Sequence, residues 1–102
     1  MDALELRQRE ERRIVRKMIR KLAAEGWTLD AVNDGEEILT GLTLTQAMRY
    51  IFDVDLSYVY FKGPAGQRHY VMLVCGNGED IISDYSFTQN DDVFSKVMDS
   101  LL

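Results

Sequence analysis

The sequence has few of the residue types that build disulfides, metal centres and membrane spans. Its 102 residues include one cysteine, one histidine and one proline. A lone Cys75 cannot form a disulfide within the chain, and its apolar neighbours predict a buried thiol in a reducing compartment. A lone His69 excludes a metal site built on two histidines of one chain. The longest apolar run, Val71 to Cys75, has too few residues to span a membrane.

The motifs of common enzyme classes are also missing. The chain contains no GxSxG motif, no P-loop and no dinucleotide-binding glycine pattern. His69 and Cys75 lie on one predicted strand, about 20 Å apart at roughly 3.3 Å per residue, so they cannot act as a nucleophile pair. We therefore expect a protein that is not an enzyme, and the sequence indicates no catalytic residue, no cofactor and no small-molecule ligand.

Charge is present but divided unevenly along the chain. Residues 1–25 carry eight Arg or Lys against five acids, whereas residues 26–102 carry four bases against twelve acids. A basic segment of net charge +3 thus precedes an acidic body of net charge −8. The first residues, MDALELRQREERR, are charged where a secretion signal would be apolar, so we expect a cytoplasmic protein.

The first 25 residues predict one amphipathic helix ending at Gly26. Its apolar stripe consists of Ile14, Val15, Met18, Ile19 and Leu22. The opposite side carries the candidate contacts for a partner or a nucleic acid, which are Arg9, Arg13, Arg16, Lys17 and Arg20. Glu11 interrupts the stripe, so residues 1–12 are expected to be either a solvated helical extension or a segment that meets a partner.

The remaining pattern predicts a hairpin, a helix, three strands and a last helix. Residues 27–39 form the hairpin, with Asn33-Asp34-Gly35 as its turn. Thr43 and Gln46 fit a capping box at the start of the second helix. Period-two segments at 56–62, 68–75 and 81–86 predict a three-stranded antiparallel meander, and residues 90–102 predict the last helix. We expect one α+β domain over 1–102, in the order α-β-β-α-β-β-β-α, with the helices on an antiparallel sheet.

The segment GNGEDIISDY, residues 76–85, raises the question of a ligand-binding loop. Asn77-Gly78 predicts a two-residue type I′ turn. That turn would pair Val74 with Ile81, Met72 with Ser83 and Tyr70 with Tyr85. Glu79 and Asp80 would then face water. We interpret the segment as a plain hairpin.

Three carboxylates offer a competing interpretation of the same region. Asp84 would lie on the last strand of the meander, and Asp53 and Asp55 precede its first strand. Together they resemble the acidic sets that hold Mg²⁺ in hydrolases. No Asp/Glu-x-Lys element accompanies them, so we predict no metal site, and whether the three converge stays open.

Tyr58 and Tyr60 are candidate interface aromatics. They share one face of their strand, while Val59 and Phe61 share the other. We expect helices to cover one face and a second subunit the other. Strand tyrosines also stack nucleic acid bases, but the acidic body repels phosphate.

The succession LTLTQAMRYIFDVD, LSYVYF and GNGEDIISDY resembles small uncharacterised proteins encoded by bacteriophages and prophages. In these, a helix and a tyrosine-containing strand precede a Gly-Asn turn and an Ile-Ser-Asp-aromatic strand. The similarity covers roughly residues 20 to 90. It implies an accessory protein in a bacterial cytoplasm, and it implies no activity for any residue.

Two functional hypotheses follow. The first is a non-enzymatic protein–protein interaction module, either a homodimer or a binder of a host or phage protein. The alternative is a nucleic-acid-binding or regulatory factor that uses Arg13, Arg16, Lys17 and Arg20. Neither involves a membrane.

Overall fold

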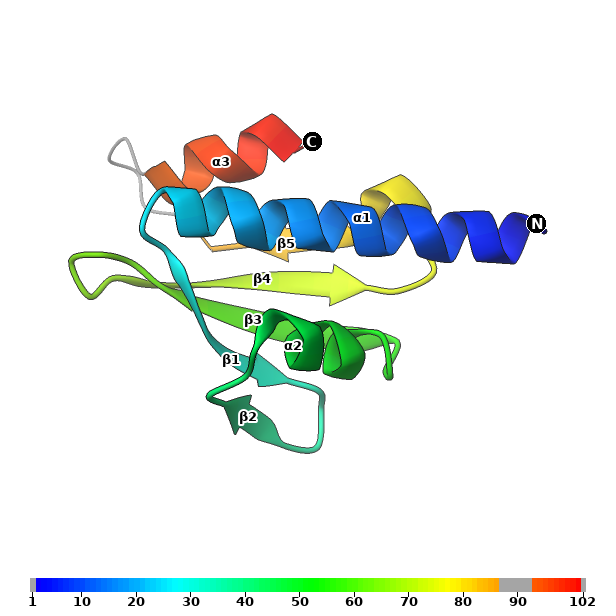
Figure 1. The fold of residues 1–102 in the computed structure, drawn as a ribbon, viewed down its shortest axis with the longest axis horizontal. Helices are drawn as coiled ribbons and strands as arrows, with labels where there is room; N and C mark the ends of the chain where they lie inside the picture. The colour runs from blue at the N-terminus through cyan, green and yellow to red at the C-terminus, as the bar shows by residue number, and fades with distance from the viewer. Residues whose placement is uncertain (1, 87–92, 102) are drawn as a thin grey trace.

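The computed structural model describes residues 2–86 and 93–101. Within them, three helices lie over a five-stranded antiparallel sheet (Figure 1). The helices are α1 (Ala3–Ala24), α2 (Leu44–Ile51) and α3 (Val93–Leu101), and a short 3-10 turn is η1 (Gly78–Asp80). The strands are β1 (Thr28–Asn33), β2 (Ile38–Thr40), β3 (Leu56–Lys62), β4 (Arg68–Val74) and β5 (Ile82–Tyr85), ordered β2-β1-β3-β4-β5 across the sheet. The predicted α+β class and element order are confirmed.

The ends of α1 are set by local chemistry. Asp2 accepts a hydrogen bond from the backbone N–H of Glu5 at 2.8 Å, which satisfies a donor that the first turn leaves free. At the other end Gly26 has φ +84°, and the N–H of Trp27 donates to the carbonyl of Leu22 at 2.9 Å. This is the left-handed glycine termination that the sequence predicts.

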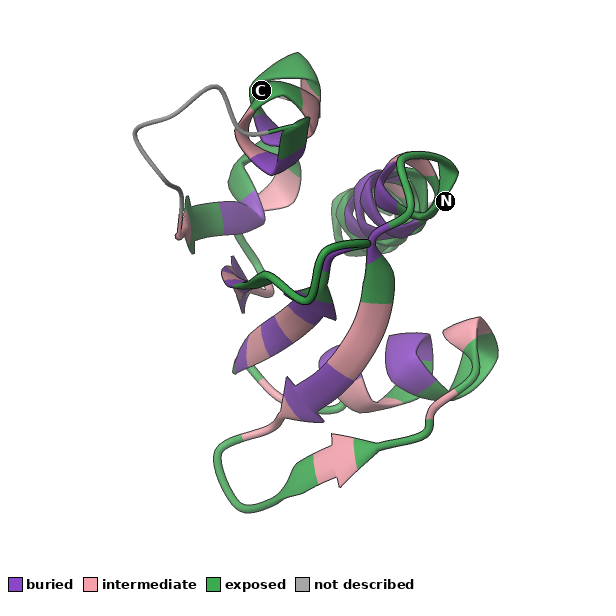
Figure 2. Cartoon of the chain, turned by 90° about the vertical axis from the view of Figure 1, so that its left-hand side faces the viewer, coloured by how far each residue is buried: buried purple, intermediate pink, exposed green. Residues whose placement is uncertain are grey.

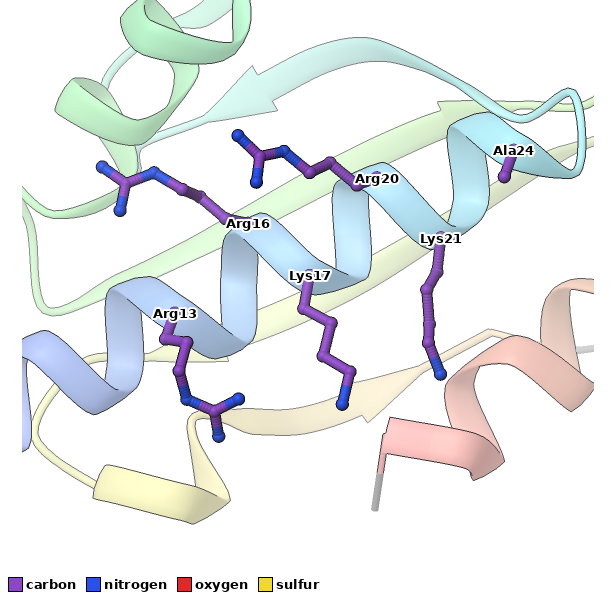
Figure 3. Close-up of a pocket in the computed structure, with 6 residues that line it drawn as sticks. All are labelled: Arg13, Arg16, Lys17, Arg20, Lys21 and Ala24. Atoms are coloured by element: carbon purple, nitrogen blue, oxygen red, sulfur yellow. The ribbon is translucent and has the colours of Figure 1, made fainter.

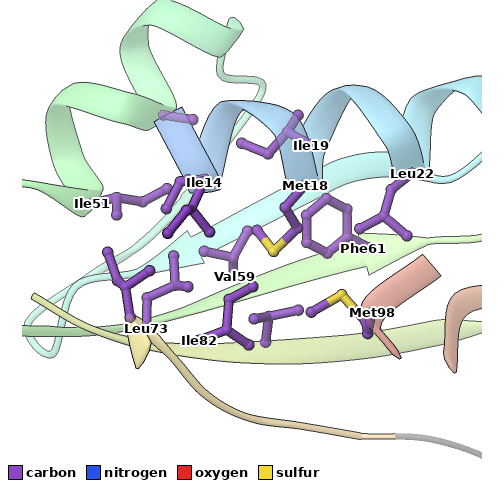
Figure 4. Close-up of a cluster of buried hydrophobic side chains, with 14 of the residues drawn as sticks. Ile14, Met18, Ile19, Leu22, Ile51, Val59, Phe61, Leu73, Ile82 and Met98 are labelled. Carbon is purple, nitrogen blue, oxygen red and sulfur yellow. The ribbon is translucent and has the colours of Figure 1, made fainter. Parts of the chain in front are cut away.

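One face of the sheet and the inner sides of the three helices form the core. The stripe of α1 packs on alternate residues of β3 and β4, and Met98 of α3 adds to one end of this cluster (Figure 4). Phe94 of α3 belongs to the same core. Val59 and Phe61 are fully buried, while the neighbouring Tyr58 and Tyr60 are only half-buried. Buried and intermediate colours alternate along strands of the sheet in Figure 2. The strand period of two therefore separates a covered face from an open one.

The first hairpin and the second helix are present, but the predicted turn at Asn33-Asp34-Gly35 is displaced: Asn33 belongs to β1 and pairs with Ile38, so the loop consists of residues 34–37. The carboxylate of Asp34 accepts hydrogen bonds from the N–H groups of Glu36 and Glu37, each at 2.9 Å, in the loop between β1 and β2. These bonds hold the pKa of Asp34 below its ordinary value because they favour the charged form. Thr43 and Gln46 make both bonds of the capping box, at 3.2 Å and 2.9 Å.

The predicted turn between β4 and β5 is wrong. Asn77 has φ −88°, which is incompatible with a type I′ turn, and the chain makes the 3-10 turn η1 instead. The register changes with it: Val71 faces Tyr85 and Met72 faces Asp84. One part of the expected pairing remains, because the N–H of Val74 donates to the carbonyl of Ile81 at 2.9 Å.

The predicted C-terminal helix is present over its described part. Residues 90–92 and 102 of that prediction lie outside the described residues. Phe94 and Met98 are buried, and Val97 and Leu101 pack against the core. Val93, the first residue of α3, is exposed.

The same substitution at two positions of α1 tests which side of the helix enters the core. Leu22 is fully buried and Leu6 is 56% exposed. We expect Leu22→Ala to lower the free energy of unfolding by about 2–5 kcal/mol. Leu6→Ala is expected to change it by less than about 0.5 kcal/mol. Urea denaturation measures both, and equal costs would contradict the observed orientation of α1.

Candidate interaction surfaces

Glu11 is a buried carboxylate held by a loop far along the chain. Its side chain is 2% exposed, and Oε2 accepts hydrogen bonds from the N–H groups of Gly76 at 2.6 Å and Gly78 at 3.0 Å. Charge-assisted bonds of this kind offset the cost of removing a carboxylate from water. The loop at residues 76–78 of the GNGEDIISDY segment therefore binds an anion, and this anion is the carboxylate of Glu11 in the same chain.

This contact explains why the turn departs from its predicted form. Gly76 and Gly78 have φ of +105° and +61°, conformations that glycine adopts without strain. They aim their two N–H groups at one point, which a two-residue hairpin loop does not do. Glu79 and Asp80 are exposed, as predicted, and take no part. The only sequence signal for the contact is an acidic residue at a stripe position of α1.

The basic residues of α1 are exposed, as the helical spacing predicts. Arg9, Arg13, Arg16, Lys17 and Arg20 all lie on the side away from the sheet. Arg13 pairs with Glu10 at 2.6 Å, and in this pair the pKa of Glu10 is lowered by the hydrogen bond from Arg13. Residues 2–9, within the predicted extension, are exposed along the first turns of α1. Their engagement of a partner stays a prediction.

Five cationic side chains on the exposed side of α1 extend in two directions and form two rows (Figure 3). Arg16 and Arg20 extend on the side of α2, and Arg13, Lys17 and Lys21 on the opposite side (Figure 3). A surface depression of about 530 Å³ lies among these side chains. Lys21 donates to the hydroxyl of Ser100 on α3 at 3.2 Å. The basic face is therefore split between two directions.

The outer face of the sheet is the second surface. Tyr58 and Tyr60 of β3 lie beside Met72 and Tyr70 of β4, with which they are in register. The rings of Tyr58 and Tyr70 meet edge to face, with centroids 5.8 Å apart. All four side chains are half-buried, because strand neighbours flank them while the described helices lie on the other face (Figure 2).

The acidic residues considered for a metal do not gather in one place. Asp53 and Asp55 are exposed in the connection from α2 to β3, whereas Asp84 lies on the outer face beside Met72. Among residues 2–86 and 93–101, no group of three or more Asp, Glu, His or Cys side chains is arranged to hold a metal ion.

Cys75 and His69 lie at opposite ends of β4 in different surroundings. The His69 ring is packed between Trp27 and Phe94, with centroids 5.3 Å and 4.8 Å away, and its Nδ1 is 3.0 Å from the hydroxyl of Ser86. Cys75 is half-buried and donates to the carbonyl of Ile51 at 3.5 Å. Burial raises the pKa of the Cys75 thiol, so it is poorly ionised at neutral pH.

Comparisons of the chain with protein-family models, with curated proteins and with solved structures found no match. The described part of the chain has no helix that is both long and apolar enough to cross a membrane.

Removing the Glu11 carboxylate tests its role as an anchor between α1 and the loop. We expect Glu11→Ala to cost about 1–3 kcal/mol of unfolding free energy, because it leaves two loop N–H groups without their acceptor. Amide hydrogen exchange at Gly76 and Gly78, followed by NMR, is expected to accelerate. The matched control is Glu10→Ala, which removes the same charge from an exposed neighbour and is expected to leave both amides protected. Unchanged exchange in Glu11→Ala would contradict the anchor.

The single thiol permits a direct test of the electrostatics around it. Burial is the largest cause of the raised pKa of Cys75, and the negative charges of Glu11 and Asp55 raise this pKa further. We expect Asp55→Asn to lower this pKa, so that alkylation by iodoacetamide becomes faster at a fixed pH between 7 and 9. Asp53→Asn is the control, since Asp53 is not among the charges that act on the thiol. An alkylation profile unmoved by Asp55→Asn, or moved equally by both, contradicts the assignment.

Proposed function

We propose that the protein is a non-enzymatic interaction module that forms a homodimer through the outer face of its sheet. We further propose that it works as a phage or prophage accessory protein in a bacterial cytoplasm, as its sequence resemblance implies. The observation that carries the dimer is the patch of Tyr58, Tyr60, Tyr70 and Met72, which none of the described helices covers.

The chemistry of this patch suits a protein surface better than solvent. Tyrosine and methionine are enriched at the centres of protein–protein interfaces, where the ring or thioether is buried and the hydroxyl keeps a polar partner. Leu56 and Val74, paired at one end of β3 and β4, extend the apolar area. Leu56 is 43% exposed, so further burial of this end removes apolar surface from water.

The charges around the patch favour a second copy as the occupant. Lys62 and Arg68 face each other in register at one end of β3 and β4, and Arg68 is ion-paired with Asp30 of β1, so this end carries two cations against one acid. The opposite end holds the acidic loop between β1 and β2, which includes Asp34 and Glu36. A two-fold axis that lies in the plane of the interface, perpendicular to the strands, would stack the two sheets face to face. The basic end of each copy would then lie over the acidic end of the other. Such an isologous contact is the commonest symmetry of soluble oligomers.

The placement of the aromatics gives less support to a nucleic-acid partner. Single-strand binders present basic and aromatic side chains on one surface, so that phosphates and bases are engaged together. Here the basic rows of α1 and the tyrosines of β3 lie on opposite layers. The nucleic-acid hypothesis stays a prediction, and it would have to rely on α1 alone.

The dimer is tested by sedimentation equilibrium at micromolar concentration. We expect a mass of twice the 11.8 kDa of the chain. Tyr60→Lys places a charge at the centre of the patch and is expected to yield a monomer, because a buried unpaired charge opposes association. Leu6→Lys is the control on an exposed apolar residue of α1 and is expected to remain dimeric. A monomer in the unaltered protein, or dimers of both variants, rejects this interface.

A further inference from the structure

The strongest feature not yet explained lies on the helical side of the sheet, between α1 and α2. A groove of about 470 Å³ runs between α1 and α2. Its cationic lining comprises Arg12, Arg16 and Arg20 from α1 and Arg49 from α2, and Asp53 is its one acid. Leu44, Thr45, Met48 and Phe52 supply the remaining walls. Four positive charges against one negative give the groove a net charge of +3 in a protein whose total is −5.

Three of the four guanidinium groups are available to a ligand. Within the described residues, Arg16, Arg20 and Arg49 make no hydrogen bond or ion pair through their side chains. Arg12 is engaged differently, lying 4.6 Å above the ring of Phe52. Arg12, Arg16 and Arg20 recur every four residues, which places them about 6 Å apart along the helix axis. They form a row along one wall of the groove.

Helix α2 lies along the groove with both of its ends. Leu44 and Thr45 are its first residues and line the groove. Phe52, the C-cap of α2, lines the groove as well, so the two ends of the helix dipole offset each other there and the positive field comes from the arginines. Like charges held together in this way repel one another, and an anion with several charges would relieve that repulsion.

We infer that this groove binds a compact ligand bearing an oligophosphate group, such as a nucleoside triphosphate or a short inorganic polyphosphate. Arginine presents a planar fork of donors that matches phosphate oxygens in pairs. A net charge of +3 is matched by a chain of two or three phosphates and not by a single carboxylate. The volume falls within the roughly 300–1,000 Å³ typical of small-molecule sites.

The dimensions and surroundings of the groove favour a compact ligand over a nucleic acid strand. Arg12 covers one face of Phe52, the aromatic side chain in the groove, which hinders base stacking on that face. Residues 26–102 carry net charge −8, so a long polyanion leaving the groove would meet repulsion. The sequence does not predict this ligand, because Arg49 joins the row of arginines on α1 only when α2 lies beside α1.

Calorimetric titration of the full chain at 150 mM salt with tripolyphosphate and with ATP tests this inference. We expect both to bind, and Arg16→Gln to weaken each about tenfold or more, because charged hydrogen bonds to phosphate are lost. Lys17→Gln is the matched control, since it removes the same charge from the adjacent position, on the other row. It is expected to change affinity by less than about threefold, given screening over about 8 Å. Circular dichroism checks that both variants fold.

The ratio of the two affinities separates the sources of the phosphate. Tighter binding of ATP would assign a nucleotide, and equal binding would assign the phosphate chain alone; both support the site. The site is overturned if neither tripolyphosphate nor ATP gives a heat of binding. It is also overturned if Arg16→Gln and Lys17→Gln lose the same amount of affinity, because that indicates non-specific attraction. Oligothymidylates that bind more tightly as they lengthen, and exceed ATP, would replace the compact ligand with a nucleic acid strand. Since Arg16 lies outside the outer sheet face, these outcomes are independent of the dimer.

Discussion

The carboxylate of Glu11, bonded to the backbone of a loop 65 residues further on, fixes where α1 lies on the sheet. Burial of a carboxylate is tolerated only while its hydrogen bonds are made. The contact therefore favours this position of α1 on the sheet over positions shifted along the helix axis, in which the two hydrogen bonds would be lost. In that register the stripe from Ile14 to Leu22 enters the core, and the arginines of the next rows remain in water. The loop in turn depends on two glycines with positive φ. Helix placement and loop shape are thus one interaction.

The placement of α1 also divides the molecule into two surfaces with different chemistry. Cations gather on the helical layer, along α1 and at Arg49 in the last turn of α2, whereas tyrosines and methionine gather on the outer face of the sheet. The core between them is about one layer of side chains thick, formed by Val59, Phe61 and their helical partners. An association proposed for one surface therefore leaves the other accessible. Recognition of a partner and of an anion can coexist in one small domain.

Features governed by neighbouring residues were predictable from the sequence, and those governed by distant contacts were not. The Gly26 termination and the Thr43–Gln46 capping box are local, and both appear as expected. The alternation along β3 likewise predicted that Tyr58 and Tyr60 share a face. The turn at Asn77-Gly78 failed because its shape is set by Glu11, which local turn preferences do not include. The groove beside Arg49 was missed for the same reason, since its walls come from two helices.

The two outermost strands of the sheet are short: β2 has three residues and β5 has four. An outer strand exposes backbone donors and acceptors that can recruit another chain, and a short one offers too few to hold it. Growth of the sheet sideways into fibres is therefore disfavoured at both margins, even though its outer face carries a patch of tyrosines and methionine. In the proposed dimer, contact through the outer face would close after two copies, so no further chain could be added.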